Sequence, residues 1–171
     1  MKIDNNNSDF QNSNWGDDID TVKFNNKDLD IYGDGNLYGA ETIVAGKNAR
    51  IILSFVNNQL MEGCISFIED YSNYSLYIID FKSIKRILKR KYGEPITDTE
   101  SWHDDTLKDF LDYGSAVASG ELRYNTVWQN GNTEISLLLG GYDGKITFCI
   151  NYSIIDYEVI EGIPNVDDSR L

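Results

Sequence analysis

The residues that most often carry enzyme chemistry are few in this chain. The sequence holds one histidine, His103, and two cysteines, Cys64 and Cys149. A histidine that acts as a general base needs a positioned partner. The acids nearest in sequence, Asp104 and Asp105, are its direct neighbours and rarely face it usefully. We therefore expect His103 to be an exposed turn residue in front of a helix.

The two cysteines lie in apolar, β-branched segments. A catalytic thiolate needs a base and electropositive surroundings, and one histidine cannot serve two such sites. Two cysteines also do not make a disulfide framework. We expect Cys64 and Cys149 to be buried, reduced and structural, at equivalent places in the two halves of a sheet.

A partial calcium-loop pattern begins at Asp28. Asp28, Asp30 and Gly33 match positions one, three and six of such a loop. Tyr32 stands at position five, and Gly39 replaces the bidentate glutamate at position twelve, which removes most of the affinity. A single histidine also excludes a multi-histidine metal centre. We expect no metal, no cofactor, no catalytic residue and no hydrolase activity.

The charge balance excludes further classes. The 171 residues include 28 acidic and 15 basic side chains, a formal net charge of −13. Proteins that coat nucleic acid need a basic face, so we expect no nucleic-acid partner. No run approaches 18 apolar residues, and the N-terminus lacks the apolar segment of a secretory signal. These patterns predict a cytoplasmic protein without membrane contact, although a chain trimmed of its leader would look the same.

One basic run stands out against this acidity. Residues 82–91 hold 6 basic side chains, while the other 161 residues carry 9 basic and 28 acidic ones. The run predicts a basic helix face away from the apolar stripe, facing solvent, made of Lys82, Lys85, Arg86, Lys89 and Arg90. Two interpretations stay open. The face either offsets the protein's own acidity and complements the helix dipole, or docks an acidic partner.

That run belongs to the clearest predicted element, an amphipathic helix over 73–92. Its apolar residues recur at steps of three and four, which places them on one helix face: Tyr74, Tyr77, Phe81, Ile84, Leu88 and Tyr92. Gly93 and Pro95 follow where a helix commonly ends. The spacing also predicts a second helix over 104–119 and a short one within 15–28.

The remaining pattern is that of strands joined by short turns. The predicted strands are 42–45, 49–56, 60–69, 122–130, 133–139 and 145–155, and the glycine-rich residues 30–39 are predicted as loop. The fold class is therefore α+β, with an antiparallel sheet of about six strands and the 73–92 helix packed on one face. We expect a single domain over 15–155, a loose tail over 1–14 and an acidic C-terminal segment over 156–171.

The two halves of the domain resemble each other. Residues 49–67 align with 133–152, which sets Cys64 against Cys149 and Ile65 against Ile150. The order of elements also repeats, which suggests tandem helix-plus-three-strand units over 15–70 and 73–155. Units that small bury their apolar faces poorly alone. Generic alternation would produce part of the same match, so duplication and chance both stay open.

A resemblance to known proteins adds to this interpretation. The chain shows Trp15-Gly16, the KYGEP run over 91–95 after the long helix, and Trp128 before a strand pair. In these features it resembles a broad set of uncharacterised bacterial α+β proteins. The architecture is similar to the tandem helix-and-sheet modules of β-lactamase inhibitory protein. That resemblance implies no activity, and protein binding by look-alike modules is an analogy at the level of fold.

These observations favour a non-enzymatic protein-interaction domain. An acidic surface suits a basic target and speeds encounter with it, so an acidic immunity or inhibitor-type protein is the leading interpretation. The alternative is a small-ligand-binding protein or enzyme whose pocket is lined by tyrosine, tryptophan and carboxylate side chains. The sequence does not indicate the oligomeric state.

Overall fold

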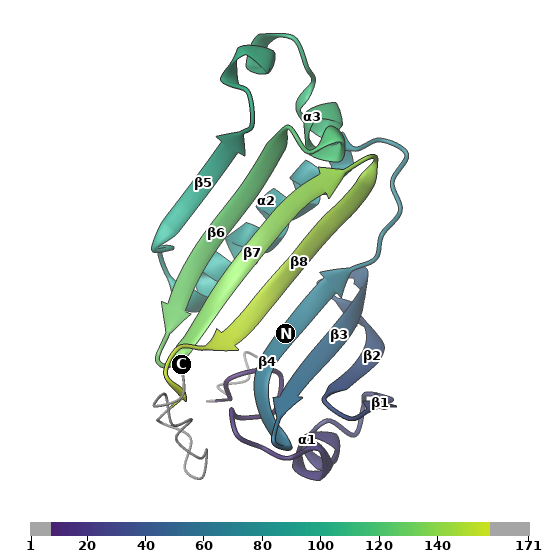
Figure 1. The fold of residues 1–171 in the computed structure, drawn as a ribbon, viewed down its shortest axis with the longest axis vertical. Helices are drawn as coiled ribbons and strands as arrows, with labels where there is room; N and C mark the ends of the chain where they lie inside the picture. The colour runs from purple at the N-terminus through teal and green to yellow at the C-terminus, as the bar shows by residue number, and fades with distance from the viewer. Residues whose placement is uncertain (1–7, 158–171) are drawn as a thin grey trace, which may run out of the picture.

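A computed structural model describes residues 8–157. Within this range the chain forms one antiparallel sheet of eight strands in the order β1-β2-β3-β4-β8-β7-β6-β5 (Figure 1). The strands are β1 (Tyr32–Asp34), β2 (Leu37–Val44), β3 (Lys47–Val56), β4 (Gln59–Phe67), β5 (Thr97–Trp102), β6 (Leu122–Asn130), β7 (Thr133–Tyr142) and β8 (Lys145–Ile154). The described helices are α1 (Ile19–Asn25), α2 (Ser75–Tyr92), the 3-10 helix η1 (Asp105–Asp109) and α3 (Tyr113–Ser119).

The α+β class is confirmed, but the predicted number of strands is too small. The sequence pattern missed β1 and β5, and it started the strand before the first hairpin at residue 42 although β2 begins at Leu37. Both missed strands are edge strands of the sheet. The exposed, polar residues of β5 carry little of the alternation that marks a half-buried strand.

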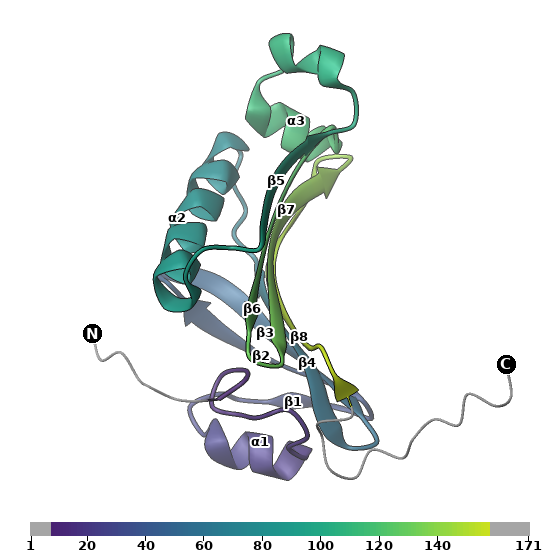
Figure 2. The ribbon, with the colours of Figure 1, turned by 90° about the vertical axis from the view of Figure 1, so that its left-hand side faces the viewer.

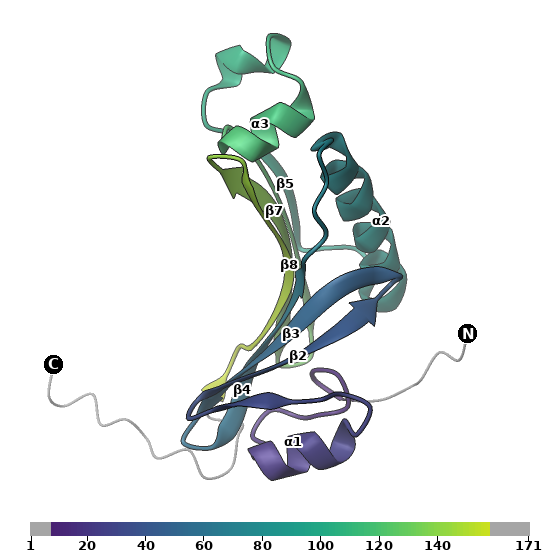
Figure 3. The ribbon, with the colours of Figure 1, turned by 90° about the vertical axis from the view of Figure 1, so that its right-hand side faces the viewer.

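The sheet is strongly curved, and the described helices lie on its convex side (Figure 2; Figure 3 shows the opposite side). Helix α2 packs along β6 and β7, and α3 contacts β6, β7 and β8 near one end of the molecule. The concave face carries none of the described helices. The molecule therefore has a covered layer, which holds the core, and an open sheet face.

The core lies between α2 and the convex face of the sheet. On β7 the buried residues alternate, with Ile135, Leu137 and Leu139 all facing the core. The predicted apolar stripe of the long helix meets this surface, and Phe81 and Leu88 are buried as expected. The helix begins at residue 75 and ends before Gly93, close to the predicted limits.

The N-terminal segment differs from the predicted loose tail. Phe10 is 2% exposed and Ser13 is 1% exposed. The indole of Trp15 donates a hydrogen bond of 2.8 Å to Thr133 Oγ1, which ties the segment to β7 in the other half of the sheet. Residues 8–14 are therefore part of the domain. Residues 1–7 lie outside the described range, as does most of the predicted acidic segment over 156–171.

The predicted helix over 104–119 is two helices. Helix η1 ends at Asp109, and α3 starts after Asp112, whose side chain accepts a hydrogen bond of 3.0 Å from the Ser115 backbone N–H. Aspartate is a preferred N-cap residue because its carboxylate satisfies an unpaired helix N–H. The N-cap in the middle of this segment therefore starts a second helix where the apolar spacing predicted one continuous helix.

The two four-stranded halves meet at the antiparallel pair β4 and β8. Ile65 lies opposite Ile150 in this pair. On one side Cys64 faces Asn151, and on the other Ser66 faces Cys149. Each cysteine therefore has the same place relative to the central isoleucine pair.

Candidate functional site

The predicted basic face lies on α2, but the protein's own acids occupy part of it. Lys85 Nζ lies 2.5 Å from a carboxylate oxygen of Asp98 on β5, and Lys89 Nζ lies 2.7 Å from Glu94. Lys85 is half-buried, contrary to the expectation that it faces solvent. Two of the five residues therefore stabilise the contact between α2 and the β5 segment.

The other members of that face point outward. Lys82, Arg86 and Arg90 are exposed and make no ion pair with any residue in 8–157. Their steps of four are close to one helical turn, so they form a single stripe on the side of α2 away from the core. The surplus positive charge of the helix is thus confined to these three exposed side chains and Lys91 at its end.

The carboxylate of Asp98 is the centre of the α2–β5 contact. Its Oδ1 accepts hydrogen bonds from Lys85 Nζ at 2.7 Å and from the buried Thr126 hydroxyl at 2.9 Å. Burial acts to raise the pKa of Asp98, but these two hydrogen bonds together with the positive charges of Lys85 and Lys89 outweigh it, and the net pKa lies below the ordinary value of 3.8. Asp98 therefore stays ionised at every ordinary pH.

This geometry predicts an acid-sensitive contribution to stability. Because the folded-state pKa of Asp98 is lowered, its contribution is complete well above pH 3.8 and is lost as the pH falls through the folded pKa. We expect Asp98→Asn to lower the free energy of unfolding at pH 7 by about 0.5–1.5 kcal/mol, since the amide keeps one acceptor. Urea unfolding at several pH values should show this difference shrinking below pH 3.8. A difference that grows in acid would contradict the assignment.

The two thiols are diagonal neighbours at the centre of the sheet. Cys149 is buried, as predicted, whereas Cys64 is half-buried, and neither is in a disulfide. A hydrogen bond from Cys64 lowers the pKa of Cys149, and the same pairing together with burial raises the pKa of Cys64. No described lysine, arginine or histidine takes part in these pKa shifts. A catalytic thiol is usually activated by a nearby cation, and neither cysteine is activated in this way.

The remaining sequence candidates lie apart from one another. His103 is exposed between β5 and η1, as expected, and the partial calcium pattern runs into strand β1. Within residues 8–157, no three histidine, cysteine or acidic side chains gather closely enough to hold a metal ion. None of the helices described in the chain combines the length and the apolar character needed to span a membrane.

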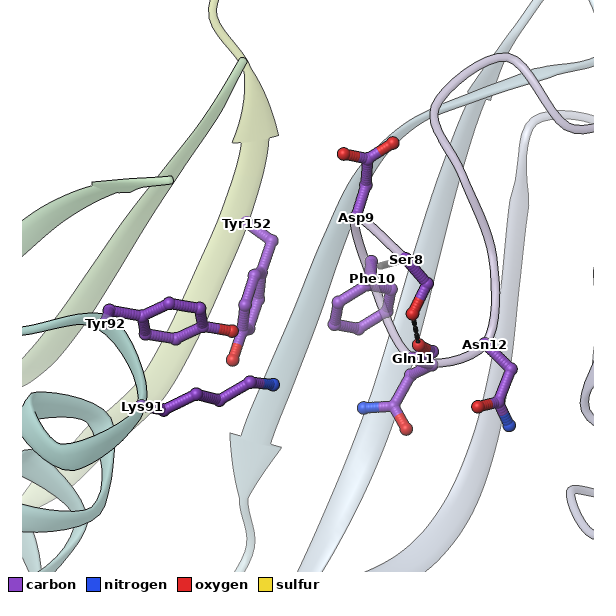
Figure 4. A pocket seen from close by; sticks show the side chains of 8 residues that line it. All are labelled: Ser8, Asp9, Phe10, Gln11, Asn12, Lys91, Tyr92 and Tyr152. Atoms are coloured by element: carbon purple, nitrogen blue, oxygen red, sulfur yellow. Dashed lines mark hydrogen bonds between the residues drawn. The ribbon is translucent and has the colours of Figure 1, made fainter. Parts of the chain in front are cut away.

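A small cavity of about 190 Å³ separates the N-terminal loop from the end of α2 (Figure 4). Tyr92 and Tyr152 line one side, and Lys91 extends toward the loop residues. The carboxylate of Asp9 is already used, because it accepts hydrogen bonds from the Trp15 backbone N–H and the Thr133 hydroxyl. Burial raises the pKa of the Tyr152 phenol, and the adjacent Tyr92 adds to this effect. The phenol therefore stays protonated and is no base.

The most exposed large apolar side chain in 8–157 is Phe110, which is 82% exposed. It lies within the helix predicted over 104–119, where its spacing from Leu107 and Leu111 would place it on a buried face. In the structure it follows η1, in a segment that projects beyond the sheet at the α3 end of the molecule (Figure 1). The signal in the sequence is the acidity around it, which is unusual for a core residue.

Comparison with known proteins adds no relative to these observations. The chain matches no protein-family model, and no curated protein or solved structure matches it significantly. The resemblance seen in the sequence therefore stays a prediction, and the chain's own surface must indicate its function.

Proposed function

We propose that this chain is a non-enzymatic protein-interaction domain that binds a basic protein. The observation that carries the proposal is the charge distribution. Outside residues 82–91 the chain has 28 acidic and 9 basic side chains, and two lysines of that basic run are paired with acids of the chain itself. The chain as a whole thus carries a large excess of negative charge, which repels anions and attracts a basic partner.

The finer form of the proposal is an immunity or inhibitor-type protein. A nuclease or another enzyme that binds phosphate presents a basic site, and an acidic domain that covers this site would block it. Electrostatic attraction of this kind mainly speeds association and fixes orientation. The unpaired cysteines support a cytoplasmic location, since disulfides are rare in that compartment.

We propose in addition that the two halves of the sheet are tandem copies of one unit. The register of β4 and β8 supports this, because Cys64 and Cys149 have the same place relative to the Ile65–Ile150 pair. These are the same residue pairs that the sequence alignment of the two halves sets together. A duplicated unit would build the open concave face from both halves.

The alternative, a small-ligand site, has one observation in its favour, the cavity beside Tyr92 and Tyr152. Its volume of about 190 Å³ is smaller than the roughly 300–1,000 Å³ typical of ligand pockets. Its one carboxylate, Asp9, already accepts two hydrogen bonds within the protein. We therefore favour protein binding.

The proposal predicts a salt-sensitive complex. Immobilised protein, exposed to an extract of its native host at low salt, should retain a stoichiometric basic protein, whose affinity is then measured by calorimetry. We expect that affinity to fall at least about tenfold between roughly 50 and 300 mM NaCl, because exposed charges are screened beyond a few ångströms at the higher concentration.

A charge-reversed helix face provides the matched control. Arg86→Glu combined with Arg90→Glu reverses the charge of two of the three residues in the exposed positive stripe and leaves the paired Lys85 and Lys89 in place. A basic partner should bind this variant as tightly as wild type or more tightly. Loss of binding would instead indicate an acidic partner on α2, and a co-purified small molecule without a protein would favour the ligand-binding alternative.

A further inference from the structure

The segment from residue 103 to 113, which we term the α3 tip, presents an aromatic ring to solvent. It connects β5 to α3 and projects past the end of the sheet (Figures 1 and 2). Phe110 near its centre is 82% exposed, while Leu107 and Leu111 beside it are half-buried, and Leu111 packs against the core. The tip is therefore anchored by Leu111, and its phenylalanine is left outside the core.

Phe110 is held in place by backbone hydrogen bonds. Its N–H donates to the Leu107 carbonyl at 3.0 Å, and the next residue, Leu111, donates to the same carbonyl. At the base of the tip, the His103 N–H donates to the Glu121 carbonyl at 2.7 Å. A backbone that is ordered before binding loses less conformational entropy when a partner covers its side chain.

The same end of the molecule carries further exposed aromatic surface. Tyr113, the first residue of α3, is 44% exposed and packs edge-on against Trp102 with 5.3 Å between ring centroids. Tyr142 at the end of β7 is 79% exposed, and the β7–β8 turn lies next to α3 (Figure 1). Tyrosine and tryptophan are the side chains enriched where proteins bind each other.

The charges around Phe110 define the chemistry of what could cover it. Four aspartates surround it in sequence, and the one lysine of the tip, Lys108, is paired with Asp105 at 2.9 Å. The other strongly exposed phenylalanine, Phe24 on α1, already has a cation over its ring, because Lys27 Nζ lies 4.0 Å from the centroid. No described lysine or arginine lies over Phe110.

We propose that the α3 tip is the docking element of this domain, and that Phe110 inserts into an apolar pocket with a lysine- and arginine-rich rim on a partner protein. The inference rests on the proposed function, since it names the surface that binds the basic partner. The rim complements the net negative charge of the tip, and a guanidinium or ammonium group can lie over the ring as Lys27 does over Phe24.

The test uses short random peptides displayed on phage and selected against the immobilised full chain. Peptides that are enriched should contain lysine or arginine beside aromatic or aliphatic residues. When synthesised, they should bind wild type and Phe24→Ala equally, and bind Phe110→Ala at least about tenfold more weakly. Asp109→Asn should reduce both the affinity and its dependence on salt. Because Phe110 is exposed, the Phe110→Ala protein should unfold at the wild-type temperature.

Each other outcome has a distinct meaning. If the enriched peptides are basic but bind Phe110→Ala as tightly as wild type, the α3 tip is not the docking element, and the proposed binding of basic partners stands. If selection enriches acidic or neutral peptides, both the inference and the proposed function fail.

Discussion

Phe10→Ala is expected to lower the free energy of unfolding by about 3–5 kcal/mol, the usual cost of deleting a buried aromatic ring. Phe10 is 2% exposed and lies against Tyr152 with 5.0 Å between ring centroids. Urea unfolding followed by tryptophan fluorescence measures the change. Gln11→Ala is the matched control, because Gln11 is the exposed neighbour and should change stability by less than about 0.5 kcal/mol.

Gly63 provides a sharper test of the same contact. This glycine on β4 lies directly under Phe10, and a side-chain carbon at position 63 would overlap the phenylalanine ring. Gly63→Ala should therefore destabilise the wild type strongly and the Phe10→Ala protein much less, so the two changes should not be additive. If Phe10→Ala proves neutral, residues 8–14 are the loose tail that their polar composition indicated.

The sequence predicted the elements in which apolar spacing and burial agree. Helix α2 and strands β3, β4, β6, β7 and β8 were found because each has one face in the core and one in solvent. The hairpin between β7 and β8 followed from Asp143-Gly144, and both residues have the positive φ that a two-residue turn needs. The sequence pattern was sufficient to predict an element wherever the polarity of its residues matches their burial in the folded protein.

Elements that depend on distant partners were not predicted. The N-terminal segment is polar overall, and its place in the core depends on the room that Gly63 leaves for one phenylalanine. Edge strand β5 is polar, and its partners are the neighbouring strand β6 and Lys85 of α2. Neither relation has a periodic signal in the sequence.

The candidate surfaces also combine features that the sequence predicts with features that depend on distant contacts. The basic run on α2 was evident from composition, but its pairing through Lys85 and Lys89 depends on where β5 and the preceding loop lie. Phe110 was misplaced because a spacing of three and four fits a stripe, whereas Asp112 starts a new helix and turns the segment outward. A cap residue inside an apolar pattern is therefore, beside the acidity around Phe110, a second signal for the α3 tip.

Leu88→Ala is expected to lower the free energy of unfolding by about 2–5 kcal/mol. Leu88 is 4% exposed in the last turns of α2 and faces the sheet core. Its neighbour Lys89 is the matched control, because its side chain is 49% exposed and its one ion pair is with the 78% exposed Glu94. Lys89→Ala should change stability by no more than about 0.5 kcal/mol, as exposed pairs contribute little.

Lys85 is the residue for which the structure and the helical spacing predict different effects on stability. That pattern places Lys85 and Lys89 alike on the solvated side, so it predicts equally small effects for both. In the structure Lys85 is half-buried and shares Asp98 with the buried hydroxyl of Thr126, so Lys85→Ala should cost up to about 1 kcal/mol more than Lys89→Ala. If the two substitutions changed the free energy of unfolding equally, the contact between β5 and α2 through Asp98 would be contradicted. A neutral Leu88→Ala with an unfolded Lys89→Ala would mean that the helix register is wrong, because the core and solvent faces of α2 would then be exchanged.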